Sequence, residues 1–208
     1  MTLEQLQNLI ALSGISLLLS AIALRLLAIL SNKSLMHYGI ALSLFIISFL
    51  SINDQSINMY LRGLFNDLSI TTMVLLSYSI IATKTAKAEY LVQRPIIFYG
   101  ISLVGIFFYP FALGIGMIDP YRWGFLATDH QQWGSILIIS LLALIMIIAY
   151  IKRNTLLLIC LALASLAFNM HLLESKNFWD YLFDPVIFLY ALTYTLWHLN
   201  SKFRYKQV

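Results

Sequence analysis

Seven apolar stretches follow one another along the chain, and short polar links separate them. They cover residues 8–30, 35–52, 60–83, 95–115, 133–151, 155–172 and 181–199. A helix that crosses a bilayer needs roughly 20 apolar residues, and the second stretch is only just long enough. No internal repeat or second domain is visible. The pattern therefore predicts an all-α fold, a single domain over residues 1–208 built as a bundle of seven transmembrane helices.

Composition supports the same interpretation. Of the 208 residues, 61% are hydrophobic and only 11% are charged, and the mean hydropathy is +0.84. A soluble domain cannot bury that much apolar surface, so we expect an integral membrane protein. The net charge of +4 does not indicate a nucleic-acid partner, because the basic residues stand singly between apolar runs and are typical of a membrane-orientation signal.

The basic residues divide unevenly between the two predicted sides of the membrane. Ten fall on one side, namely Arg25, Lys33, Lys84, Lys87, Arg94, Lys152, Arg153, Lys202, Arg204 and Lys206. Only three fall on the other side, together with every acidic residue except Glu89. Because lysine and arginine mark the cytoplasmic side, we expect the N-terminus and the link 117–132 outside and the C-terminus in the cytoplasm. Short links suit the inner (cytoplasmic) membrane of a bacterium.

The third apolar stretch opens with polar residues. Arg62, Asn66 and Asp67 lie within its first two turns, and Asp67 would sit roughly 10 Å along a continuous helix from Tyr60. A carboxylate at that depth costs several kcal/mol or more unless it is paired or hydrated. Arg62 and Asn66 are spaced to share a helix face, so Asp67 is expected to point elsewhere and to need a partner from another helix. We therefore predict a hydrogen-bond donor close to Asp67, from Arg62, Arg122 or a polar residue of another helix.

Candidate binding residues gather on the predicted outer face. They are Arg62, Asn66, Asp67, Asp119, Tyr121, Arg122, His130, His171, Glu174, Asp180 and Asp184. An ordinary explanation remains open, because aromatic belts and acidic outer loops are common in membrane proteins. The depth of two of the acids, Asp67 and Asp184, argues for more than that.

The spacing of these residues predicts how they are arranged. Asp180 and Asp184 would share one helix face and repel each other unless a cation or a bound proton separated them. We expect the outer ends of the third and seventh stretches to lie close together, with the turn Asp119–Arg122 over them. In that turn Asp119 can accept a hydrogen bond from its own backbone, and Tyr121 and Arg122 would face the lipid headgroups. Arg62 and Arg122 are candidates for binding a lipid phosphate or a partner's carboxylate.

Metal and cofactor chemistry have little support in the sequence. His171 and Glu174 are three residues apart, which is the spacing of a Glu-x-x-His metal-ligand pair in reverse order, and His130 could supply a further nitrogen ligand. However, no HExxH motif, cysteine pair or repeated ligand spacing occurs, and no hydrolase, nucleotide or kinase signature is present. We expect no metal and no cofactor.

The run Arg62-Gly63-Leu64-Phe65-Asn66-Asp67-Leu68-Ser69 resembles the phrase that begins a membrane helix in proteins of the lipoteichoic-acid-synthase and phosphoethanolamine-transferase type. Those proteins join a small membrane bundle to an extracytoplasmic catalytic domain of the alkaline phosphatase superfamily. This chain departs from them in having seven stretches rather than about five and no catalytic domain, so no catalytic residue carries over. The resemblance implies a stand-alone relative of the membrane part, which would work with a separate envelope enzyme.

Three functions follow as hypotheses, and the sequence leaves open whether the protein is an enzyme. The first is an accessory or binding subunit that presents its acidic and aromatic outer face to an envelope lipid, a glycan carrier or a partner protein. The second is a small membrane enzyme acting on a lipid headgroup, with Asp67, His130 or Asp184 as acid or base. The third is a proton- or cation-coupled carrier that uses Asp67 and Asp184. Inverted repeats would favour the carrier, and none is visible.

Overall fold

The computed structural model describes residues 1–30, 34–82, 95–126 and 132–205. Within these ranges the chain is all-α apart from one short hairpin, β1 (Ser51–Ile52) with β2 (Gln55–Ser56). The helices are α1 (Leu3–Leu30), α2 (Ser34–Ile47), α3 (Ile57–Phe65), α4 (Ile70–Ala82), α6 (Pro95–Ala112), the 3-10 helix η2 (Pro120–Gly124), α7 (Gln132–Ile151), α8 (Thr155–Asn169), α9 (Trp179–Leu182) and α10 (Pro185–Tyr205).

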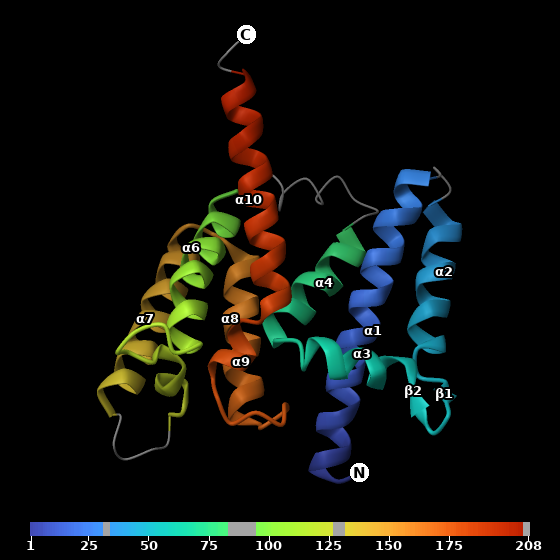
Figure 1. Ribbon diagram of the computed structural model, residues 1–208, viewed down its shortest axis with the longest axis horizontal. Helices are drawn as coiled ribbons and strands as arrows, with labels where there is room; N and C mark the ends of the chain where they lie inside the picture. The colour runs from blue at the N-terminus through green and yellow to red at the C-terminus, as the bar shows by residue number, and fades with distance from the viewer. Residues whose placement is uncertain (31–33, 83–94, 127–131, 206–208) are drawn as a thin grey trace.

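The helices form two groups that α4 joins. In the first group, α1 packs along α2. In the second group, α6 packs along α10 and α7 packs along α8. Helix α4 contacts both α1 and α8 (Figure 1). The short helices α3 and α9 and the hairpin lie toward the end of the bundle that holds the N-terminus (Figure 1).

Three predicted stretches differ from the helices that form. The stretch 35–52 becomes a helix that ends at Ile47, because the chain then turns into the hairpin, where Asn53 and Asp54 adopt positive φ angles. The stretch 60–83 is broken between α3 and α4, where Asn66 takes a φ of 60° and a ψ of −169°. The stretch 181–199 is broken between α9 and α10, because proline disfavours helical backbone at the residue before it and Phe183 is already extended.

Polar contacts hold the first group together. The hydroxyls of Ser16 in α1 and Ser48 beyond α2 lie 2.7 Å apart, and Asn58 of α3 donates to Ser16 over 3.3 Å. Asn58 is fully buried. Serine and asparagine contacts of this kind are the usual polar links between membrane helices. The apolar core of the second group centres on Ala164, Leu173 and Tyr181, against which Ile70 of α4 packs.

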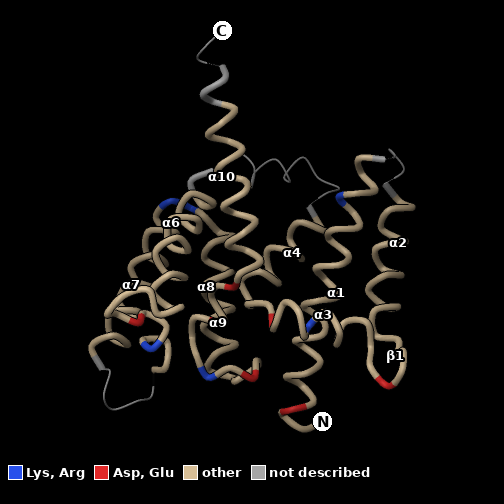
Figure 2. The backbone as a smooth tube through the Cα atoms, in the orientation of Figure 1, with Lys and Arg blue, Asp and Glu red and all other residues tan. Residues whose placement is uncertain are grey.

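Two helices of the described chain, α1 and α7, are long and apolar enough to cross a bilayer. Four more apolar helices have 10–17 residues. Charge is distributed unevenly between the ends of the bundle. Among the described residues, the acidic positions lie between the middle of the bundle and the end that holds the N-terminus, whereas lysine and arginine occur in both halves (Figure 2).

Candidate functional site

Arg62 lies in the last turn of α3 and pairs with Asp67 across the helix break. Its Nε donates to Oδ1 of the carboxylate and its Nη2 donates to Oδ2 over 3.0 Å. The side chains of Arg62 and Asp67 are only 20% and 14% exposed. Two parallel bonds from a guanidinium to a carboxylate are among the stronger side-chain interactions in proteins. The predicted donor near Asp67 is therefore confirmed.

The same guanidinium reaches two further elements. Nη1 donates to Oδ1 of Asn8 in α1, and Nη2 lies 3.0 Å from Oε1 of Glu174 in the loop between α8 and α9. We call Asn8, Arg62, Asp67 and Glu174 the Arg62 network. It ties together α1, the α3–α4 break and the α8–α9 loop, which are far apart in sequence.

The break itself corrects one expectation. Asn66 does not share a helix face with Arg62, because α3 ends at Phe65 and Asn66 is the exposed residue that follows it. The backbone N–H of Asn66 still donates to the carbonyl of Arg62 over 2.8 Å. The sharp change of direction lets Asp67 fold back onto the arginine five residues before it. The main partner of Asp67 therefore comes from its own predicted stretch and not from another helix.

Asp184 joins the beginnings of two helices. Its Oδ2 accepts a hydrogen bond from the backbone N–H of Ser69 over 2.8 Å, just before α4. Its Oδ1 accepts from the backbone N–H of Ile187 over 2.9 Å, in the first turn of α10. Asp184 is 4% exposed. Helix N-termini carry unpaired N–H groups and partial positive charge, so a buried carboxylate is stabilised here without a cation.

Asp180 has separate partners. The hydroxyl of Tyr121 donates to its Oδ2 over 2.8 Å, and the hydroxyl of Ser175 donates to the same atom. Because Phe183 interrupts the helix, Asp180 and Asp184 do not share the face of one continuous helix. The prediction that Asp180 and Asp184 need a cation or a proton between them is therefore wrong. Each carboxylate has its own neutral hydrogen-bond donors.

The turn Asp119–Arg122 lies against α9, which confirms its predicted place beside the start of the seventh stretch. Asp119 accepts from the backbone N–H of Tyr121 over 3.0 Å, which confirms the expected side-chain turn. The indole N–H of Trp179 donates to the carbonyl of Pro120, and the buried amide of Asn177 donates to the carbonyl of Tyr121. A Cβ atom added to Gly124 would overlap the side-chain oxygen of Asn177, so the close approach of η2 to this loop requires glycine.

Tyr121 faces inward rather than toward lipid headgroups, because its hydroxyl is bonded to Asp180. Burial raises the pKa of Tyr121 to about 12, and the hydrogen bond to Asp180 adds to the shift. The phenol is therefore a neutral donor at physiological pH. Arg122 is different: its side chain is 69% exposed and contacts only Asp119, at 3.3 Å, among the ion pairs of the described residues. A pair so exposed contributes little to stability.

The helical spacing of His171 and Glu174, which the sequence offered as a weak metal-site alternative, does not form. Helix α8 ends at Asn169, and His171 is an exposed residue with a φ of 52° in the following turn, so its spacing to Glu174 is not helical. The backbone carbonyl of His171 accepts a bond from Gln7 over 2.7 Å. His130 lies outside the described residues. The residues that the structure describes contain no group of three or more potential metal ligands.

The predicted site residues thus form two clusters with Asp184 beside them. One is the Arg62 network and the other contains Asp119, Tyr121 and Asp180. Several residues that hold the clusters together were not predicted, namely Asn8, Ser69, Ser175, Asn177 and Trp179. One signal was readable: aspartate followed by proline is the preferred start of a helix, which points to Asp184 as a cap.

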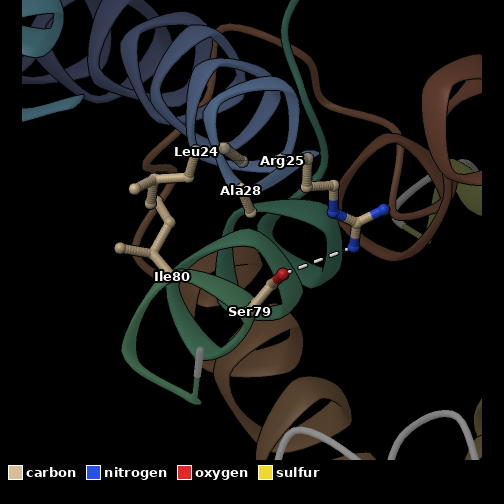
Figure 3. Close-up of a pocket in the computed structure, with 6 residues that line it drawn as sticks. Leu24, Arg25, Ala28, Ser79 and Ile80 are labelled. Atoms are coloured by element: carbon tan, nitrogen blue, oxygen red, sulfur yellow. Dashed lines mark hydrogen bonds between the residues drawn. The ribbon is translucent and has the colours of Figure 1, made fainter. Parts of the chain in front are cut away.

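A second polar site lies at the opposite end of α1. Arg25 donates to the hydroxyls of Tyr190 over 3.0 Å and of Ser79 over 3.3 Å, and its guanidinium stands 5.1 Å from the centre of the Tyr190 ring. It borders a cavity of about 190 Å³ between α1 and α4 (Figure 3). These contacts join α1, α4 and α10 through one long side chain.

Comparison with models of protein families, with curated proteins and with solved structures finds no match to this chain. Any function must therefore be inferred from the chemistry and placement of its own residues.

Proposed function

We propose that this chain is a multi-pass protein of a bacterial inner membrane that acts as a binding or accessory subunit. Its acidic and aromatic outer face would be presented to an envelope lipid, a glycan carrier or a partner protein. The observation that carries this proposal is the Arg62 network, because it holds two of the predicted outer acids, Asp67 and Glu174, against one arginine.

Exposed apolar surface supports the membrane placement. In the apolar window of α7 only 17% of the residues are buried. Large side chains of this helix, such as Ile139, Ile147 and Ile151, are at least half exposed. Each square ångström of such surface costs roughly 25 cal/mol in water, and a surround of lipid chains removes that cost.

The proposal includes seven crossings, with the N-terminus outside and the C-terminus in the cytoplasm. The ten-to-three division of basic residues supports it. Helices α2, α4 and α8 have 14, 13 and 15 residues and are shorter than the roughly 20 that a span needs. Short helices are accommodated by local thinning of the bilayer. At the outer end, α3 exposes Tyr60, Leu64 and Phe65, as an interfacial helix does.

The contacts of the outer acids support a role in binding more than a role in proton transfer. Asp67, Asp180 and Asp184 each accept two or more hydrogen bonds from within the chain. Carboxylates held in this way are structural acceptors, and a carrier or an acid–base catalyst needs them to exchange partners during its cycle. Among the described residues, the exposed charged groups and histidine on this face include Arg122, His171, Glu174 and Lys176, together with the acids Glu4 and Asp54. A guanidinium and an ammonium there suit a phosphate or a carboxylate of a ligand.

The resemblance of residues 62–69 to the membrane part of envelope transferases supports a separate envelope enzyme as one possible partner. In this chain the run covers the end of α3, the break and the approach to α4, and it supplies the arginine, the aspartate and the Ser69 N–H of the scaffold.

Thiol labelling tests the placement. We expect Lys176→Cys to react with a membrane-impermeant maleimide in intact cells and Asn200→Cys to react only after permeabilisation. Cys160 is buried, and the unmodified chain controls for its reaction. Labelling of Asn200→Cys but not Lys176→Cys in intact cells would reverse the orientation and overturn the outer-face proposal.

A second experiment tests binding against chemistry. A photo-crosslinking residue at position 122 should give a defined adduct in cells, whereas one at position 200 should not give that adduct. The purified chain should neither release headgroups from phosphatidylglycerol or phosphatidylethanolamine nor drive cation uptake into proteoliposomes. Turnover or uptake that Asp67→Asn abolishes would replace this proposal with the enzyme or the carrier.

A further inference from the structure

A long apolar cavity lies within the second helix group. Its volume is about 710 Å³, and residues of α4, α6, α7, α8, α9 and α10 line it. The lining is almost entirely aliphatic along its length, with Ile101, Leu142 and Leu157 as examples. Ligand cavities in proteins span about 300–1,000 Å³, so this one is large enough for an organic ligand of considerable size.

The cavity is elongated along the helices. Its lining on α7 runs from Ile138 to Lys152, which corresponds to about 21 Å of helix. The hydrocarbon layer of one leaflet is about 15 Å thick, half of the roughly 30 Å bilayer core. The cavity therefore runs in the direction of a lipid chain and is at least as long as one.

The two ends of the cavity differ in chemistry. Helix α7 begins beside η2, because Gly134 lies against the Trp123 side chain, and it ends at Ile151, so Lys152 lies at the end remote from the outer-face clusters. Lys152 is exposed and has no ion pair within the described residues. Arg153 adds a second positive charge. At the other end Thr71 lines the cavity, and its buried hydroxyl has no hydrogen-bond partner.

We propose that this cavity binds one acyl chain of an anionic phospholipid, with the lipid phosphate beside Lys152. The site rests on the membrane placement proposed above, which puts Lys152 at the level of the inner-leaflet headgroups. An aliphatic trough with a cation at its mouth matches the two parts of such a lipid, because the chain fills the trough and the phosphate meets the ammonium. A bound lipid would fill the space between α6 and α7 and couple these helices to α8 and α10.

Gly100 offers a position at which a larger side chain can be introduced beside the cavity. A Cβ atom added to Gly100 of α6, which lines the cavity, would meet no heavy atom within 4 Å. Gly100→Phe therefore places a ring in the trough. Gly39 of α2 also has open space around it and does not line the cavity, so Gly39→Phe is the matched control.

Native mass spectrometry of the purified full chain tests the site, with phosphatidylglycerol, phosphatidylethanolamine and free oleate as probes. We expect phosphatidylglycerol to remain bound preferentially. Gly100→Phe should abolish that adduct and Gly39→Phe should retain it. Lys152→Gln should weaken it roughly tenfold, since a charge-assisted hydrogen bond is lost. Circular dichroism establishes that each variant keeps its helix content.

Several outcomes would overturn the proposal. They are equal retention of phosphatidylethanolamine, retention of phosphatidylglycerol by Gly100→Phe, and an unchanged affinity of Lys152→Gln. Tighter binding of oleate than of phosphatidylglycerol would assign the trough to a free fatty acid instead. Any of these results together with the expected thiol labelling would remove only the lipid site, whereas a failure of the labelling would remove the membrane placement itself.

Discussion

The side chain of Asp184 and the backbone N–H of Ser69 form a 2.8 Å hydrogen bond that joins two helix beginnings more than a hundred residues apart in sequence. The second oxygen of the same carboxylate caps α10. The bond connects the α4 region, which packs against α1, with the helix that packs against α6. Asp184 is therefore a structural joint between the two helix groups.

Replacing Asp184 with alanine should destabilise the protein strongly. The change removes a helix cap, worth about 0.5–2 kcal/mol, and leaves the buried N–H of Ser69 unpaired, at about 1–3 kcal/mol. We expect a total loss of about 2–4 kcal/mol, measured as a lower midpoint of thermal unfolding in detergent.

The control for this prediction is Glu4→Ala, which removes an exposed acid from the first turn of α1 and should change the midpoint little. Asp184→Asn keeps one acceptor oxygen and should fall between the two. If Asp184→Ala unfolds at the same temperature as Glu4→Ala, the joint contributes nothing.

The sequence predicted the fold class and the surroundings of the acidic side chains better than it predicted where the helices break. Long apolar runs predict helices because a helix pairs its backbone N–H and C=O groups internally, without water. The pairing of Asp67 follows from the cost of an isolated charge. The meeting of the third and seventh stretches was also predicted, and the bond between Ser69 and Asp184 confirms it.

The breaks were missed because hydrophobicity does not report them. Residues 60–83 read as one apolar helix, but the glycine-like backbone at Asn66 divides it. Nothing in the local composition requires that conformation, and it follows from the contacts of Asp67 with Arg62 and of Ser69 with Asp184. The break at Phe183 was readable from Pro185. The inward orientation of Tyr121 depends on Asp180, 59 residues away, and no local pattern encodes it.

Arg62 and Asp67 should show strong coupling in a double-mutant cycle. Arg62→Gln leaves a partly buried carboxylate without its cation, and Asp67→Asn leaves the guanidinium with fewer acceptors. Because the two side chains interact directly, the double variant should be less destabilised than the sum of the single changes by about 1–3 kcal/mol. The measurement is the unfolding midpoint of the four proteins in the same detergent. Additive effects would show that Arg62 acts mainly through Asn8 and Glu174.

Glycine at position 66 should make the protein more stable than the native asparagine does. Its φ of 60° and ψ of −169° lie in a region that glycine alone adopts readily, at a cost of about 1–3 kcal/mol for other residues. Asn66→Gly should therefore raise the unfolding midpoint, and Asn66→Ala should not. Gly63, three residues earlier in α3, has open space around it and helical backbone. Gly63→Ala should be stabilising by about 0.5–1 kcal/mol, so the two positions should favour opposite residues. Destabilisation by Asn66→Gly would contradict the conformation.

Tyr121 should make the stability of the protein sensitive to high pH. Its pKa is about 12 in the folded chain, against the ordinary value of 10.0, because burial disfavours the phenolate and Asp180 accepts a bond from the phenol. The unfolded chain therefore loses this proton first as the pH rises. The stabilisation is complete below about pH 10 and is lost progressively toward about pH 12. Unfolding midpoints measured across this range should fall more steeply for the native chain than for Tyr121→Phe, which has no proton to lose. The ultraviolet titration of the folded protein should also lose one late tyrosinate component in this variant. Parallel curves for the two proteins would show that Tyr121 is not held by Asp180.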